Sequence, residues 1–129
     1  MRANDQRVVV AALIERGGRL LVSQRGTGAF AGLWEFPGGK REAGETDEQA
    51  LARELSEELD IEVEIGLLAH TTRAGPLELR FFRCAWMGGQ RPRALQAVQF
   101  RWVSRAELAV YRFLPADSGL IAALTAGEI

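Results

Sequence analysis

One segment, from Thr46 to Leu59, constrains the fold of this chain more than any other. Thr46 and Gln49 have the spacing of a capping box, in which each side chain accepts a hydrogen bond from the other residue's backbone N–H. A leucine then recurs at every fourth position and gives a helix one apolar ridge: Leu51, Leu55 and Leu59. We therefore predict a helix from Asp47 to Leu59 that packs its ridge against another layer of the fold.

Most of the remaining chain has the pattern of β-strands. Val8–Ile14 is an apolar, β-branched run, typical of a strand buried on both faces, and a glycine turn joins it to a second strand at Leu20–Ser23. Further extended segments are expected at 34–36, 61–65, 67–72, 77–86 and 98–103. We expect Pro37-Gly38-Gly39 to end the first of these.

Two shorter helices are expected near the C-terminus. Ser104 and Glu107 repeat the capping pattern, and Asp117 or Ser118 is placed to cap a last helix that ends near Ala126. Strands outnumber helices, and three helical segments are available to cover a sheet. The predicted fold is therefore α/β (α+β), with a mixed β-sheet sandwiched between helices.

Composition excludes several classes of function. The 129 residues suffice for one domain, which we place at 1–129. Sixteen basic and 17 acidic side chains lack the basic excess of a nucleic-acid-binding protein, so we expect no nucleic-acid polymer as partner. The longest apolar run, Val8–Ile14, is too short to cross a bilayer, and Met1–Gln6 is too polar for a signal peptide. With Cys84 as the only cysteine, we expect a cytoplasmic protein, away from membranes. A chain of this size can work as a monomer, and we expect one.

The acidic residues of the predicted helix form a cluster. At 100° per residue, Glu54, Glu57 and Glu58 share one side of the helix, beside the leucine ridge. Glu58 lies about 20° from Leu51 and should be partly buried. Like charges at this spacing repel, and burial makes each of them costlier. A solvated acidic face is one interpretation; the other is a magnesium ion, bound by oxygen ligands, that carries a substrate's phosphates.

The complete segment resembles a known motif. Gly39, Glu45 and the run from Arg53 to Glu58 have the spacing of the Nudix box, and eight of its nine fixed positions are met. The exception is Asp60, where the family has a glycine that ends the helix in a left-handed conformation. Aspartate adopts that conformation at a cost of roughly 1 kcal/mol, so we expect a small loss of stability and intact chemistry. The resemblance implies the Nudix fold and a Mg²⁺-dependent hydrolase, with Mn²⁺ as a substitute metal.

The resemblance also implies roles for individual residues. Four residues would bind the metal: Gly38 through its carbonyl, and Glu54, Glu57 and Glu58 through their carboxylates. Glu54 would bind metal, activate the attacking water, or do both. Arg53 would hold Glu45 or Glu57 in place by a forked ion pair, and Glu45 could also reach the cation.

One position departs from many relatives, which carry a further glutamate at or shortly before the tryptophan that matches Trp102. This chain has Arg101 and Gln96 there, and no acidic residue between Leu79 and Ala106. The resemblance therefore allows a lower metal count than in those relatives, and it favours Glu54 as the base.

The flank LWEFPGGK, residues 33–40, looks like the MutT branch, the 8-oxo-dGTP diphosphatases, and also like the bacterial CTP pyrophosphohydrolases. The implied reaction splits a nucleoside triphosphate into a monophosphate and pyrophosphate. MutT proteins typically have asparagine at the position of Asp117. A protonated Asp117 could mimic that amide, whereas an ionised one would accept from the exocyclic amine of cytosine. Alternatively, Asp117 only caps the last helix.

Three further residues are candidate substrate contacts. Arg25 follows the second strand, where relatives contact the phosphate, or it is an ordinary surface arginine. Phe36 could supply an aromatic face for the base, or pack in the core. Lys40, beside the glycines, is either a phosphate neighbour or a surface residue.

The sequence thus predicts an enzyme for a small nucleotide, with 8-oxo-dGTP first and CTP or 5-methyl-dCTP as the alternative. A diphosphate-linked substrate such as ADP-ribose is a further alternative, disfavoured by the short chain. A catalytically inactive nucleotide sensor is the last, and it is disfavoured because every glutamate of the box is present.

Overall fold

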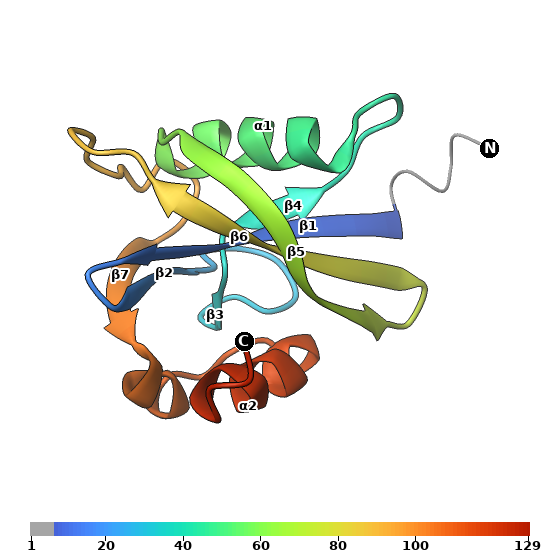
Figure 1. Cartoon of the computed structure of the whole chain (residues 1–129). Coiled ribbons are helices and arrows are strands. Elements are labelled where there is room, and N and C mark those ends of the chain that lie inside the picture. Colours follow the sequence, from blue (N-terminus) through green and yellow to red (C-terminus); the bar gives the residue numbers. More distant parts are fainter. Residues whose placement is uncertain (1–6) are drawn as a thin grey trace.

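The computed structural model describes residues 7–129, so the polar segment Met1–Gln6 lies outside the described residues. Within that range, one seven-stranded mixed sheet has helices on both faces (Figure 1). The strands are β1 (Val8–Arg16), β2 (Arg19–Gln24), β3 (Trp34–Glu35), β4 (Gly38–Lys40), β5 (Val63–Ala74), β6 (Leu77–Trp86) and β7 (Gln99–Ser104). The helices are α1 (Asp47–Leu59), the 3₁₀ helices η2 (Arg105–Val110) and η3 (Pro115–Asp117), and α2 (Ser118–Thr125). The predicted sandwich of helices around a mixed sheet is confirmed.

Strand β1 is the centre of the sheet. It pairs in parallel with β6 and antiparallel with β2 and β4, while β5 extends the sheet beyond β6 and β7 pairs with β2. Its apolar residues are buried on both faces, as its sequence predicts, and they pack into two separate hydrophobic cores. One core lies under α1 and the other under α2, on opposite faces of the sheet (Figure 1).

Helix α1 has the capping box and the buried leucine ridge that its sequence predicts. The Gln49 backbone N–H donates to the Thr46 hydroxyl at 3.1 Å, and the Thr46 N–H donates to the Gln49 side chain at 2.9 Å. The leucine ridge is fully buried against the sheet. At the other end Asp60 adopts the left-handed conformation, with φ 55° and ψ 44°, and its N–H bonds to the carbonyls of Leu55 and Ser56.

The observed strands differ from the expected ones at two places. The first extended segment ends before Pro37, as expected, but a further strand was missed, because Gly38–Lys40 forms β4 and pairs with β1. A Cβ on Gly38 would lie 1.9 Å from the Val10 carbonyl oxygen, so glycine is what allows this close approach. The segments at 61–65 and 67–72 are one strand, β5, interrupted by register shifts between Ile65 and His70. The capped turn after Ser104 is present, as a 3₁₀ helix.

No helix of residues 7–129 is long and apolar enough to cross a membrane.

An ion-pair network fastens the start of α1 to the sheet. Asp47, in the first turn, accepts from Arg41 after β4 at 2.5 Å and from Arg80 on β6 at 2.8 Å. Arg80 also pairs with Glu78 at 2.8 Å. All of these side chains are at most one third exposed, so water weakens the pairs only in part.

We expect Asp47→Ala to lower the free energy of unfolding by roughly 2 kcal/mol, because it leaves two half-buried guanidinium groups without their shared carboxylate. The change is measured as the shift in the urea midpoint. Glu48→Ala, an exposed neighbour in the same turn, is the control and should cost less than about 0.5 kcal/mol. Equal losses for both variants would contradict the role of the network.

Candidate active site

Three carboxylates converge where α1 faces β3 and β4. Burial raises the pKa of Glu58 to about 8, and the neighbouring carboxylates of Glu54 and Glu35 add to the shift, while a bond from the Gly38 N–H opposes it. Glu35 also has a raised pKa, chiefly through burial. Glu58 is half-buried, as its position on the helix predicts. The cluster is short of positive charge.

Arg53 organises the other side of the cluster. Its guanidinium forks onto Glu45, with Nε and Nη2 donating to the two carboxylate oxygens at 2.7 and 3.0 Å. Nη1 donates to Glu54 at 3.1 Å and to Glu57 at 3.3 Å, and Nη2 also reaches the Lys40 carbonyl at 3.1 Å. Hydrogen bonding to Arg53 lowers the pKa of Glu45. One side chain thus joins the loop before α1, the helix and β4.

The position of Glu54 depends on Gly39. A Cβ at Gly39 would lie 2.3 Å from the Glu54 carboxyl carbon, so the carboxylate occupies the space that any larger residue would need. The side chain of Glu54 is 14% exposed and that of Glu57 is 47% exposed. Glu54 therefore faces β4, while Glu57 lies toward solvent on the Arg53 side.

The donor chemistry of this cluster fits a divalent cation. The side chains that converge offer carboxylate oxygens, the ligands that magnesium prefers, and burial together with their mutual repulsion raises the pKa of Glu58. Within residues 7–129, no three acidic, histidine or cysteine side chains are already arranged to hold a metal ion. Glu57 accepts from Arg53 at 3.3 Å and Glu35 accepts from Arg25 at 3.0 Å.

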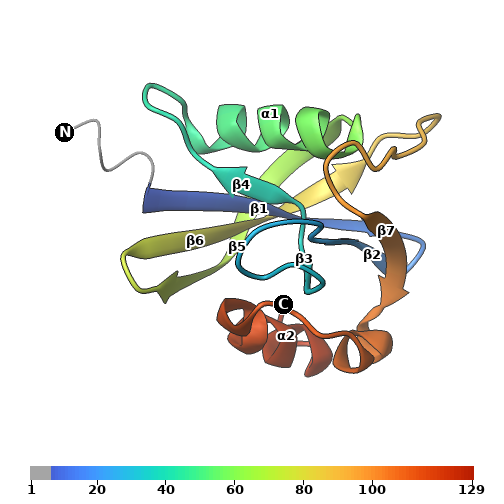
Figure 2. The same cartoon turned by 180° about the vertical axis from the view of Figure 1, so that it is seen from behind.

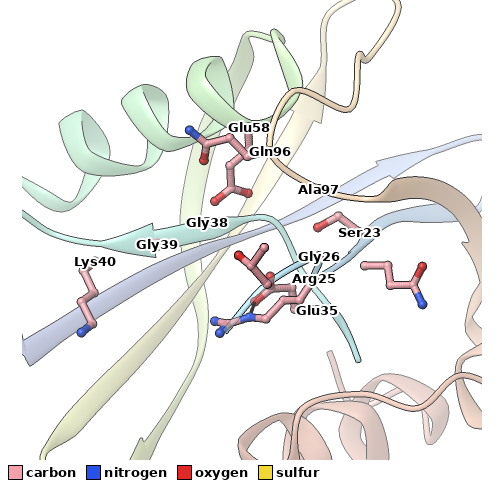
Figure 3. Close-up of a pocket in the computed structure, with 12 residues that line it drawn as sticks. Ser23, Arg25, Gly26, Glu35, Gly38, Gly39, Lys40, Glu58, Gln96 and Ala97 are labelled. Carbon is pink, nitrogen blue, oxygen red and sulfur yellow. Dashed lines mark hydrogen bonds and ion pairs between the residues drawn. The ribbon is translucent and has the colours of Figure 1, made fainter. Parts of the chain in front are cut away.

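Two clefts meet at β4. The carboxylate cleft, about 580 Å³, is lined by Ser23, Gln24, Arg25, Gly26, Thr27, Glu35, Gly38, Gly39, Lys40, Glu58, Gln96 and Ala97. The apolar cleft, about 590 Å³, lies toward α2, and its walls include Phe36, Phe81, Leu114 and Asp117. Figure 3 shows Glu58 on the α1 side of the β4 chain, with Arg25 and Glu35 on the other side. Five residues line both clefts: Arg25, Glu35, Gly38, Gly39 and Lys40.

The residues proposed for substrate contact lie in these clefts. Arg25 pairs with Glu35 on their shared border, and Lys40 is exposed there. Phe36 is 3% exposed and stacks on Phe113 with ring centres 5.4 Å apart, so it belongs to the core and also lines the apolar cleft. All three of these residues therefore line the apolar cleft.

Asp117 is a buried acid at the end of the apolar cleft. It is 2% exposed, and burial raises its pKa to about 7, with Glu35 adding to the shift and Arg25 opposing it. It stands at the N-cap position of α2, but its side chain makes no capping hydrogen bond. The interpretation that Asp117 only caps the helix is therefore wrong.

Sequence reasoning missed Glu35 as a site residue. Trp34 and Phe36 are buried while Glu35 between them is not, and this alternation along an extended segment was visible in the sequence. Of the two positions that replace the extra glutamate of relatives, Gln96 lines the carboxylate cleft, whereas Arg101 is exposed and bonds to Gln99.

Comparison with known proteins identifies the chain. The sequence model of the NUDIX domain matches residues 9–123. The chain belongs to the Nudix family. It is 44% identical to the Mycobacterium tuberculosis protein named "Putative 8-oxo-dGTP diphosphatase 2", over 91% of this chain and 86% of the relative. It is 40% identical to the CTP pyrophosphohydrolase of Escherichia coli, over 92% and 90% of the two chains.

A solved structure of MutT, from work on Aliivibrio salmonicida and Vibrio cholerae, superposes with a TM-score of 0.77 at 34% identity, over 92% of this chain and 95% of that one. The chain is a MutT-like Nudix nucleotide pyrophosphohydrolase. Nudix enzymes typically depend on a divalent metal.

Substitution of Gly39, which contacts Glu54, should lower activity without lowering stability. Gly39→Ala should leave the melting temperature within a few degrees of the wild type, because the group that must move is the flexible end of a side chain. Because the resemblance implies a catalytic role for Glu54, we expect pyrophosphate release to fall at least about 100-fold, the effect of displacing such a group by about 1 Å. Gly88→Ala, which meets no atom within 4 Å, is the control for both measurements. Full activity in Gly39→Ala would show that the position of Glu54 is unimportant.

Proposed function

We propose that this Nudix protein hydrolyses a nucleoside triphosphate to a monophosphate and pyrophosphate with Mg²⁺, and that 8-oxo-dGTP is its preferred substrate. The observation that carries the proposal is the junction of the two clefts. A cluster of carboxylates braced by Arg53 adjoins an apolar cleft that ends in a buried acid, and both share Arg25 and Lys40. A triphosphate needs a cationic and metal-binding site for its tail beside an apolar site for its base.

The residues that would hold the metal are Gly38, Glu54, Glu57 and Glu58, and Mn²⁺ should substitute for Mg²⁺. When bound, such a cation neutralises phosphate charge and activates water. Glu54 accepts the proton of the attacking water through its carboxylate, which the Gly39 backbone and Arg53 fix in place. Arg53 keeps this geometry through its fork onto Glu45. Arg25 and Lys40, on the border of both clefts, are the available cations for the phosphates.

The raised pKa of Asp117 supports 8-oxoguanine as the preferred nucleobase. An acid with a pKa of about 7 is about half protonated at neutral pH, whereas an ordinary aspartate is almost fully ionised there. Protonated, it offers one donor and one acceptor, as an asparagine amide does, and can pair with the edge of an oxidised guanine. Phe36, Phe81 and Leu114 supply the apolar walls of the same cleft.

A cytosine nucleotide is the second candidate, and the ionised form of Asp117 favours it. Arg25 acts to lower the pKa of Asp117, and an ionised carboxylate accepts from the exocyclic amine of cytosine. The Escherichia coli relative named CTP pyrophosphohydrolase adds support.

Glu54→Gln should reduce kcat for pyrophosphate release by about 10³-fold, because an amide cannot take a proton from water. Thermal unfolding should show no loss of stability, since the change removes one member of a repelling cluster. Glu48→Gln, an exposed acid on the same helix, should keep the full rate. A near-normal rate for Glu54→Gln would remove Glu54 from the mechanism.

The nucleobase preference is tested by comparing pyrophosphate release from 8-oxo-dGTP, dGTP, CTP, dCTP and 5-methyl-dCTP with magnesium present. We expect the ratio of kcat/KM for 8-oxo-dGTP over dGTP to fall as the pH rises through about 7, because Asp117 ionises there. Asp117→Asn should keep the ratio high and independent of pH.

A preference for the cytosine nucleotides that grows above the same pH would support the second candidate instead. Absence of pyrophosphate from all five would refute the triphosphate proposal, and ADP-ribose would then be the next substrate to test.

A further inference from the structure

The loop between β2 and β3 presents an aromatic side chain to the apolar cleft. Phe30 is 44% exposed, yet it lines this cleft together with Ala29. Figure 2 shows the loop curving away from β2 and returning to β3 above α2. A phenyl ring held partly in water lacks some of the stabilisation that burial gives, and a ligand bound in the cleft would supply that burial.

The loop is built to hold Phe30 there. The Arg25 N–H donates to the Leu33 carbonyl at 2.9 Å, and the Gly32 N–H donates to the Arg25 carbonyl at 2.8 Å, which closes the base of the loop. The Leu33 N–H donates to the Phe30 carbonyl at 3.1 Å. Gly32 has a φ of +89°, a conformation that other residues rarely adopt. The same bonds fix the backbone of Arg25, on the border of the two clefts.

We propose that Phe30 is a nucleobase-binding residue, which packs its ring on the base of the nucleotide in the apolar cleft. This inference rests on the proposed function, because it takes the ligand to be a nucleotide. Phe36 and Phe81 belong to the core wall of the cleft, and Phe30 supplies an aromatic surface from the loop. Contact with a ring face does not depend on the hydrogen-bonding edge of the base. Phe30 therefore contributes affinity for every base, whereas Asp117 selects among them.

The test compares Phe30→Ala with the wild type on dGTP and CTP. We expect KM to rise about tenfold for both nucleotides, the size typical of one lost stacking contact, with kcat within twofold. Inorganic triphosphate, which has no base, should inhibit both proteins with the same constant. Phe30→Tyr should keep the wild-type KM, because it keeps the aromatic ring. Val110→Ala, which removes a more exposed apolar side chain outside the cleft, is the control.

Calorimetric titration of dGMP and CMP tests the same inference without catalysis. Weaker binding of both by Phe30→Ala supports it, even if the wild type releases no pyrophosphate and the proposed function fails. Unchanged KM and binding in Phe30→Ala, an equal loss for inorganic triphosphate, or no binding of either monophosphate by the wild type would overturn it. Circular dichroism should show that Phe30→Ala is folded, because the side chain lies at the surface.

Discussion

Burial of the leucine ridge of α1 against the sheet determines where the acidic side chains of the helix lie. The ridge is fully buried, and Glu54 and Glu58 flank it, so packing brings their carboxylates toward β4. This position is electrostatically unfavourable for the Glu58 carboxylate, because its pKa is raised by burial and by its neighbours. Hydrophobic energy from the leucines thus holds in place a cluster of charges that is unfavourable by itself.

Arginines limit this repulsion at two points and leave the middle of the cluster uncompensated. Arg53 neutralises Glu45 and contacts Glu54 and Glu57 from the outer side, and Arg25 neutralises Glu35 from the side of the apolar cleft. Glu58 has neither as a direct partner among these ion pairs, and it is the member with the strongly raised pKa. The two arginines therefore frame a location where added positive charge is favourable.

How far the sequence predicted this structure depended on the range of the interactions involved. Thr46, Gln49 and the leucines define α1 through contacts within a few residues, and the helix was predicted to its observed ends. Strand β4 was missed because its pairing with β1 joins segments almost 30 residues apart and shows no local signal beyond its glycines. Likewise, the burial of Asp117 and its proximity to Glu35 follow from the packing of α2, which no local pattern gives. The spacing of the glutamates in the Nudix box was enough to find them in the sequence. It did not predict that Glu54 faces β4 while Glu57 lies toward solvent.

The parallel pairing of β1 with β6 has a consequence for how the chain folds. Val8 lies beside Glu78 and Glu15 beside Ala85, so the first strand finds this partner only after some 70 residues have been ordered or looped out. Contacts between such distant segments close large loops and slow the folding of a small domain relative to a helical bundle of the same length. During synthesis on the ribosome, β1 has an open edge until β6 emerges. The central strand is thus the first strand of the sheet to be synthesised, and it is among the last to have both of its edges paired.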